Sequence, residues 1–176
     1  MNWYKVVKVA KDVSKEYSWV YVDMPKEFCK DFLRFGEEID PDDLFINEAE
    51  NGLEKDPHVT VKYGLLTNEA KDIRDRFKDE TGGKVKISES SFFSGDEYDV
   101  LKFTVVSKDL ERLHTRLNEL PHEDSFCDYK PHATIAYLKK GCGKKYDGKF
   151  KFNKTFEFSE VFFGDKNRKN HKCKLI

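Results

Sequence analysis

The chain has 176 residues, which fits one domain of ordinary size better than two domains of about ninety residues each. Hydrophobic residues make up 38% of the chain and aromatic residues 14%, a composition that excludes a wholly disordered protein. Lys plus Arg (32) nearly equal Asp plus Glu (33), which excludes the global positive charge of a non-specific nucleic-acid binder. We expect a single domain over residues 1–176.

The charge is distributed unevenly along the chain. From residue 139 to the end there are 12 Lys or Arg against 4 Asp or Glu, so this segment has a formal charge of +8. Residues 1–138 then have a charge of -9, and the two add up to the net charge of -1. Anionic ligands would favour the C-terminal surface. The alternative is a solvated face of amphipathic strands.

The sequence predicts a cytoplasmic protein with reduced thiols. Its four cysteines are scattered, its start, MNWYKVVKVAKD, contains no apolar leader, and no apolar run is long enough to cross a membrane. We expect no membrane association and no obligate protein partner. No Cys-x-x-Cys pair occurs, so we expect no metal site, and nothing in the sequence calls for a cofactor.

The first half of the chain predicts two strand and helix pairs. The β-branched and aromatic run YSWVYVD predicts a strand, and Phe residues at helical spacing after Pro25 predict a helix. The acidic segment that follows reads as a long ordered loop, and a second strand and helix come after it. In order, these elements cover 17–23, 25–39, 40–56, 57–66 and 67–83.

The second half predicts a hairpin, a Leu-striped helix and further strands. The hairpin is joined through SGDEY, and the helix ends before Pro121. The alternating Phe residues near the C-terminus predict a sheet with one wet face, so the tally is about seven strands and three helices in an α+β fold. These elements cover 84–93, 99–107, 108–120, 131–138 and 149–163.

One segment of the chain is repeated. The sequence PHVTVKY at 57–63 matches PHATIAY at 131–137, with Pro, His, Thr and Tyr in register 74 residues apart. Because alternate side chains of a strand share a face, His58 and Thr60 point together, and so do His132 and Thr134. The other face of each copy is apolar and suits a core.

Two such strands can hold one phosphate from both sides. A neutral imidazole can remove a proton from an attacking hydroxyl while a protonated imidazole gives one to the leaving oxygen. The hydroxyls of Thr60 and Thr134 would donate to the non-bridging phosphate oxygens, so no metal is required. We therefore expect a bell-shaped pH dependence of kcat/KM with both limbs between pH 5 and 8.

The doubled His-x-Thr pattern resembles the 2H phosphoesterase superfamily, and the resemblance covers most of the chain. It implies a bilobal fold of two antiparallel sheet lobes around a central cleft, with helices on the outer faces, and metal-independent chemistry on 2',3'-cyclic phosphates or 3'-5' linkages. By this resemblance the catalytic residues are His58, Thr60, His132 and Thr134.

Among branches of that superfamily, the runs EYSWVYVDMP, PHVTVKYGL and DYKPHATIAYLKKG look most like phage and mobile-element members, including anti-CBASS phosphodiesterases. This resemblance implies cleavage of cyclic oligonucleotide second messengers. The alternatives are a 2',3'-cyclic phosphodiesterase, an RNA 3'-end processing enzyme, and a module that binds nucleotides without cutting them.

Further residues are candidates for substrate binding. Strand parity places Lys62 on the His58 face, where it could hold a phosphate oxygen or point to water. Base stacking needs aromatic rings, and Trp19, Tyr21, Phe126 and Tyr129 are candidates, with core packing as the alternative for each.

Several residues are expected to be structural instead. Tyr63 and Tyr137 repeat with the motif, but parity assigns them to the core. For His114, His122 and His171 a surface or capping role is expected. The acidic loop and the Lys-rich loop around Cys142 are either lids over a ligand or solvated connections.

Overall fold

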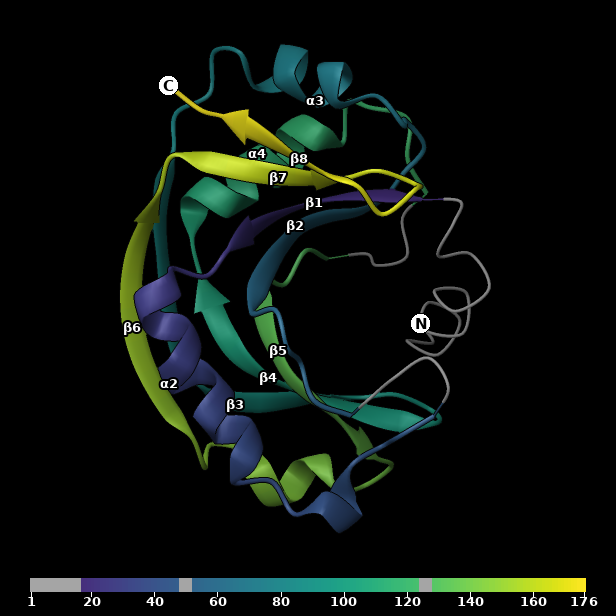
Figure 1. Cartoon of the computed structure of the whole chain (residues 1–176), viewed down its shortest axis with the longest axis vertical. Coiled ribbons are helices and arrows are strands. Elements are labelled where there is room, and N and C mark those ends of the chain that lie inside the picture. Colours follow the sequence, from purple (N-terminus) through teal and green to yellow (C-terminus); the bar gives the residue numbers. More distant parts are fainter. Residues whose placement is uncertain (1–16, 48–51, 124–127) are drawn as a thin grey trace.

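The structure, a computed structural model, describes residues 17–47, 52–123 and 128–176, and within them the strands form two four-stranded antiparallel sheets. The first sheet has the order β2-β1-β7-β8 and the second the order β5-β4-β3-β6, so the expected two-lobed α+β fold is confirmed (Figure 1). The first sheet contains β1 (Ser18–Asp23), β2 (His58–Leu65), β7 (Glu160–Gly164) and β8 (Asn170–Lys174). The second contains β3 (Gly83–Ser94), β4 (Tyr98–Val106), β5 (His132–Lys139) and β6 (Lys151–Phe158).

Helix α2 (Lys26–Glu37) covers one face of the second sheet. Its Phe residues recur every three to four positions, so they share one side of the helix. The ring of Phe32 lies 5.4 Å from that of Phe103 on β4 and 5.7 Å from that of Phe152 on β6. Phe32 is 1% exposed, and removing such a buried ring costs about 3–5 kcal/mol.

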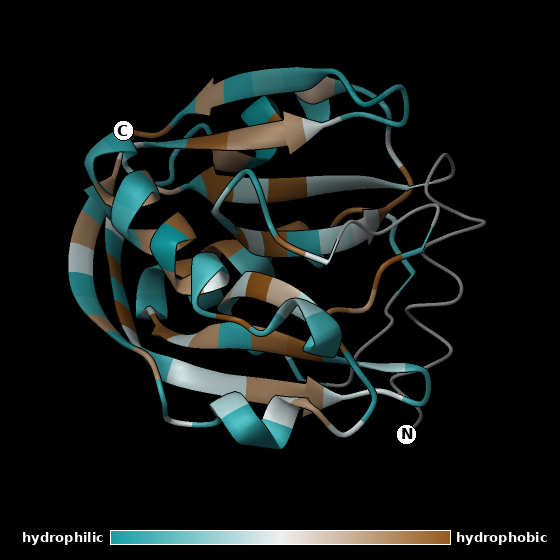
Figure 2. Ribbon diagram, turned by 60° about the horizontal axis from the view of Figure 1, so that its bottom comes forward, coloured by the Kyte–Doolittle hydropathy of each residue, from teal (hydrophilic) through white to brown (hydrophobic). Residues whose placement is uncertain are grey.

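Helices α3 (Ala70–Phe77) and α4 (Lys108–Leu117) lie against the first sheet (Figure 1). Ser107 caps α4, because its hydroxyl accepts a hydrogen bond from the amide of Leu110 at 3.1 Å. Leu113 and Leu117 continue the buried stripe that begins at Leu110. In Figure 2 the outward sides of the helices are hydrophilic, as an amphipathic helix requires.

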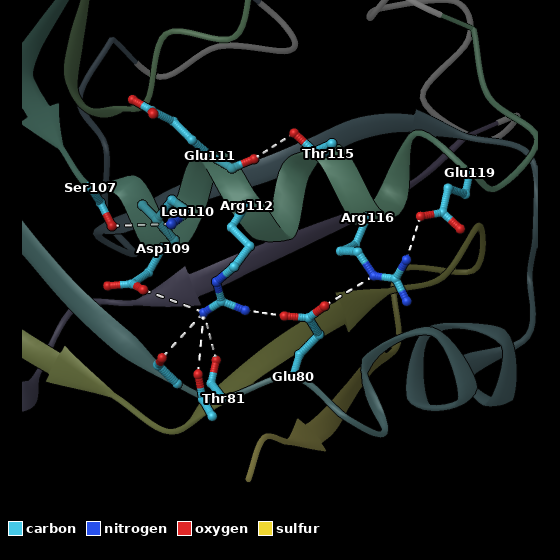
Figure 3. Close-up of polar contacts among 11 residues, drawn as sticks. Glu80, Thr81, Ser107, Asp109, Leu110, Glu111, Arg112, Thr115, Arg116 and Glu119 are labelled. Carbon is cyan, nitrogen blue, oxygen red and sulfur yellow. Dashed lines mark hydrogen bonds and ion pairs between the residues drawn. The ribbon is translucent and has the colours of Figure 1, made fainter.

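A charged cluster fastens α4 to the segment that follows α3 (Figure 3). The carboxylate of Glu80 pairs with the guanidinium groups of Arg112 and Arg116, the latter with its Nε at 3.0 Å. Arg112 also donates to the carbonyl of Thr81 at 3.0 Å. Side chains from α4 in turn contact β2, so this cluster helps to fix the strand that carries the first motif.

The aromatic stretch near the C-terminus is two strands and not one. It breaks at Ser159, and the chain passes from β6 in the second sheet to β7 in the first. The buried side chains of β6 fall on even positions, whereas Val161 and Phe163 of β7 are buried at odd positions, and this change of parity marks the break. The prediction also missed β8, whose short charged sequence NHKCK carries one buried residue, Cys173.

The acidic and Lys-rich segments are bonded to each other. Each contains a short 3-10 turn, η1 (Pro41–Asp43) and η2 (Gly143–Tyr146). The Asp43 carboxylate accepts hydrogen bonds from Lys145 at 2.7 Å and from the hydroxyl of Tyr146 at 2.6 Å. None of the helices described is long and apolar enough to cross a bilayer.

Candidate active site

The two motif strands meet although they belong to different sheets. β2 is an edge strand of the first sheet and β5 is an edge strand of the second, and these two edges lie side by side. The imidazoles of His58 and His132 are close enough that the charge of His58 contributes to lowering the pKa of His132. The fold therefore brings the two copies of the motif together from distant parts of the chain.

Each motif contains a β-bulge at the same place. In β2 the pairing with β1 runs from Tyr21↔Thr60 to Val20↔Lys62, which leaves Val61 unpaired. In β5 the pairing with β4 leaves Ile135 unpaired in the same way. Val61 and Ile135 are equivalent positions of the two copies, and a bulge of one residue reverses which face the following side chains occupy.

The bulge corrects two expectations about strand parity. Lys62 does not share the face of His58, because its side chain is 2% exposed and its ammonium donates to the Oδ1 of Asn118 on the helix side at 2.7 Å. Tyr63 and Tyr137 are shifted to the face that carries the histidines, and both are partly exposed where burial was expected. A uniform period of two cannot foresee this change of face.

We call the sheet surface that carries His58 and Thr60, or His132 and Thr134, the motif face of each sheet. Nδ1 of His58 lies 2.7 Å from the carbonyl oxygen of Asp56, and Nδ1 of His132 lies 2.8 Å from that of Lys130. A carbonyl oxygen only accepts, so each Nδ1 carries a hydrogen. Each Nε2 is then left to bind or release a proton, and no side chain in the described segments bonds to it.

The two imidazoles have different electrostatic surroundings. Burial lowers the pKa of His132 to about 4, opposed by its bond to the Lys130 carbonyl and supported by smaller contributions from the charges of Lys102 and His58. His58 instead lies opposite Asp23 in the pairing of β2 with β1. Burial raises the pKa of Asp23, and the charge of His58 partly offsets this rise. His132 is therefore neutral at pH 7, while His58 lies among carboxylates.

Thr60 and Thr134 are partly exposed on the motif faces. Within the residues that the structure describes, neither hydroxyl is engaged in a hydrogen bond, although the carbonyl of Thr60 accepts one from the hydroxyl of Tyr129 at 2.9 Å. Both hydroxyls can therefore donate to an incoming anion.

An aromatic cluster lies beside His58 on the motif face of the first sheet. The ring of Tyr21 is 5.4 Å from the His58 ring, edge to face, and it stacks on Phe162 at 5.6 Å. Trp19 stacks on Tyr21 at 6.5 Å, and the guanidinium of Arg168 lies 4.8 Å above the Trp19 ring. Trp19 and Tyr21 therefore share the histidine face, where Trp19 is partly exposed, whereas Tyr21 is 8% exposed and packs inside the cluster instead of offering a free ring to a base.

Tyr129, another aromatic candidate, lies elsewhere. Tyr129 stacks on His114 at 4.1 Å, and its bond to the Thr60 carbonyl braces β2 instead of pointing along the motif face. Burial raises the pKa of Tyr129, so its hydroxyl stays a donor. Phe126 lies outside the described residues.

The sequence did not single out Lys102, which lies on β4 opposite Thr134. Its signal was a lone charged residue inside the otherwise uncharged strand sequence VLKFTVV. Phe93 on β3, whose ring is 5.0 Å from that of His132, was also missed, because hairpin aromatics usually pack in the core. Among residues 17–47, 52–123 and 128–176, no three His, Cys, Asp or Glu side chains gather in a metal-binding arrangement.

Comparison with known proteins gives structural neighbours only. No family profile and no curated protein sequence matches the chain. TT0787 of Thermus thermophilus superposes with a TM-score of 0.62 at 13% identity, covering 91% of this chain and 95% of that one. LigT of E. coli complexed with 3'-AMP gives 0.62 at 13% identity, with 92% and 95% covered, and Usb1 of Kluyveromyces marxianus gives 0.59 at 9% identity, with 93% and 100% covered. The chain therefore shares the fold of these proteins along nearly its whole length.

Proposed function

We propose that the chain is a metal-independent phosphodiesterase whose catalytic residues are His58, Thr60, His132 and Thr134. The observation that carries the proposal is the pair of His-x-Thr strands that meet edge to edge, each imidazole anchored through Nδ1 and presenting Nε2. Structural neighbours support phosphodiester chemistry, since one of them is described as a phosphoesterase and covers 92% of this chain at 14% identity with a TM-score of 0.57.

The electrostatic difference between the histidines suggests their roles. On a 3'-5' linkage with a free 2'-hydroxyl, Nε2 of neutral His132 takes the hydroxyl proton, and the 2'-oxygen forms a bond to phosphorus. The bond from phosphorus to the 5'-oxygen breaks, and Nε2 of His58 gives its proton to that oxygen. The products are a 2',3'-cyclic phosphate end and a 5'-hydroxyl, and the two threonine hydroxyls donate to the non-bridging oxygens as charge grows on them.

We propose cyclic oligonucleotides as the substrate, of the kind that anti-CBASS phosphodiesterases destroy in host cytoplasm. The partly exposed ring of Trp19, in the aromatic cluster beside His58, supports a substrate with bases, because stacking on aromatic rings holds a nucleotide without sequence preference. Neighbours of this fold have been crystallised with nucleotides, LigT with 3'-AMP and Usb1 with uridine monophosphate.

The test is turnover of a panel of cyclic di- and trinucleotides, nucleoside 2',3'-cyclic phosphates and short RNAs in the presence of EDTA. We expect cleavage of cyclic oligonucleotides that is lost in His58→Ala and in His132→Ala, and unaffected by His122→Ala, an exchange away from both motifs. Turnover only of 2',3'-cyclic phosphates or of RNA ends would reassign the substrate. Binding without turnover of any panel member would replace the enzyme by a nucleotide-binding module.

A further inference from the structure

A buried lysine without a carboxylate partner lies on the motif face of the second sheet. Lys102 is 7% exposed, and its Nζ donates to the hydroxyl of Ser91 at 2.6 Å and lies 4.4 Å from the centre of the Phe93 ring. In the described part of the chain, no carboxylate comes within ion-pair distance of this ammonium. An ammonium withdrawn from water in this way is costly unless an anion binds to it.

The ammonium nevertheless carries its charge at neutral pH. Burial lowers the pKa of Lys102 to about 8, a shift opposed by the charge of Asp147 and increased by that of Lys130. His132, the titratable group of the adjoining strand, is neutral at pH 7 and adds no positive charge there. The fold thus holds a cation in an apolar setting with only neutral partners in contact.

Hydroxyl groups surround this cation on the same sheet. Ser91 accepts from Lys102 and lies 2.9 Å from the hydroxyl of Thr104, which is opposite His132 in the ladder. Lys102 itself is opposite Thr134. One of the two hydroxyls donates to the other, so the ammonium and the remaining hydroxyl hydrogen form a donor set suited to phosphate oxygens.

The site is distinct from the place where the reacting phosphate would lie. That phosphate has to contact Nε2 of both histidines and the hydroxyls of their threonines. The donors at Lys102 lie on β3 and β4, whereas those groups lie on β2 and β5, and the Phe93 ring contacts both the His132 ring, at 5.0 Å, and the ammonium of Lys102, at 4.4 Å. An anion at Lys102 therefore lies next to the strand that carries His132 and Thr134.

We propose that Lys102, Ser91 and Thr104 form a subsite for a second phosphate of the substrate, next to the phosphate that reacts. The inference rests on the proposed function and narrows it. A cyclic dinucleotide or a longer oligonucleotide carries a phosphate on both sides of a sugar and fills both places. A dinucleoside monophosphate fills only the catalytic place.

The subsite is tested by affinity, because binding can be measured apart from turnover. In a His58→Ala background, calorimetry compares cyclic di-AMP with ApA, the linear dinucleoside monophosphate of the same bases, and failure of cyclic di-AMP to bind more tightly than ApA would overturn the subsite. Lys102→Met should weaken binding of the cyclic dinucleotide by about 10- to 100-fold, the usual contribution of a charge-assisted hydrogen bond, and that of the linear compound by less than about threefold. Lys102→Arg should retain much of the affinity.

The matched control is Lys154→Met, which removes the same charge from the same sheet. Lys154 lies over the Phe28 ring of α2, on the face that the helix covers, so its loss should change neither affinity. Equal losses for both ligands in Lys102→Met, or no loss for either, would overturn the subsite. Turnover by the unmutated protein is measured separately. A protein without turnover that still binds the cyclic dinucleotide more tightly than the linear compound, and only when Lys102 is present, would refute the proposed reaction and still support the subsite.

Discussion

The pKa of His132 makes a quantitative prediction about the pH dependence of catalysis. With this pKa at about 4, about 90% of His132 is neutral at pH 5, whereas with the ordinary value of 6.5 about 3% would be neutral. Since a general base must be unprotonated, loss of this base should lower kcat/KM by only about 1.1-fold between pH 7 and pH 5, against about 25-fold for an unperturbed histidine. This revises the expectation that both limbs lie between pH 5 and 8.

The assay is kcat/KM on one phosphodiester substrate from pH 3.5 to 9 at constant ionic strength, with circular dichroism at each acid pH to confirm that the protein is folded. An NMR titration of the imidazole carbon Cε1 assigns the acid limb, since its signal for His132 is absent in His132→Gln. Lys102→Met removes a positive charge that lowers the pKa of His132, so it should move the acid limb to higher pH. An acid limb between pH 6 and 7 that follows the His132 signal would refute this assignment.

Three further predictions concern stability and ligand binding. Glu80→Gln should lower the free energy of unfolding by about 1–3 kcal/mol in urea titrations, because two arginines of α4 lose their shared carboxylate, whereas Glu157→Gln at an exposed pair should cost under about 0.5 kcal/mol. Lys102→Met should raise the free energy of unfolding by about 1–3 kcal/mol at pH 7. The pKa of Lys102 is about 8 in the folded protein and 10.5 in the unfolded chain, so the unmutated protein becomes more stable between these pH values and the difference in stability between the two proteins shrinks. A variant that is less stable than the unmutated protein at pH 7 would contradict this. Gly164→Ala places a Cβ 2.3 Å from the Trp19 ring, so it should displace the indole. Nucleotide affinity measured by calorimetry should then fall by roughly 5- to 100-fold, about as much as in Trp19→Ala. Unchanged affinity in both variants would remove Trp19 from the binding surface.

The parts of the fold that follow a regular period could be predicted from the sequence. The Phe residues of α2 and the Leu residues of α4 repeat at helical spacing, and both helices bury the stripe that the spacing indicates. The two His-x-Thr copies also lie on strands that adjoin, as their shared register suggested. Local pattern was sufficient in these places because one side of each element faces the core.

What could not be predicted depends on departures from that period. The bulges at Val61 and Ile135 turn Lys62 inward and bring Tyr63 to the histidine face, although the sequence VTVKY reads as plain alternation. A bulge is set by how the neighbouring strand pairs, which one strand's sequence does not state. Lys102 was missed for a related reason, since its place beside Thr134 follows from the register between β4 and β5.

The roles of the two histidines are tested most directly with a substrate whose 5'-oxygen is replaced by sulfur. A thiolate leaves without being protonated, so a general acid is no longer needed, whereas the attacking 2'-hydroxyl still needs a base. The account predicts that this phosphorothiolate restores cleavage to His58→Ala, which is inactive on the oxygen substrate, and does not restore it to His132→Ala. Rescue of His132→Ala in place of His58→Ala would reverse the roles, and rescue of neither would contradict paired acid-base catalysis at this site.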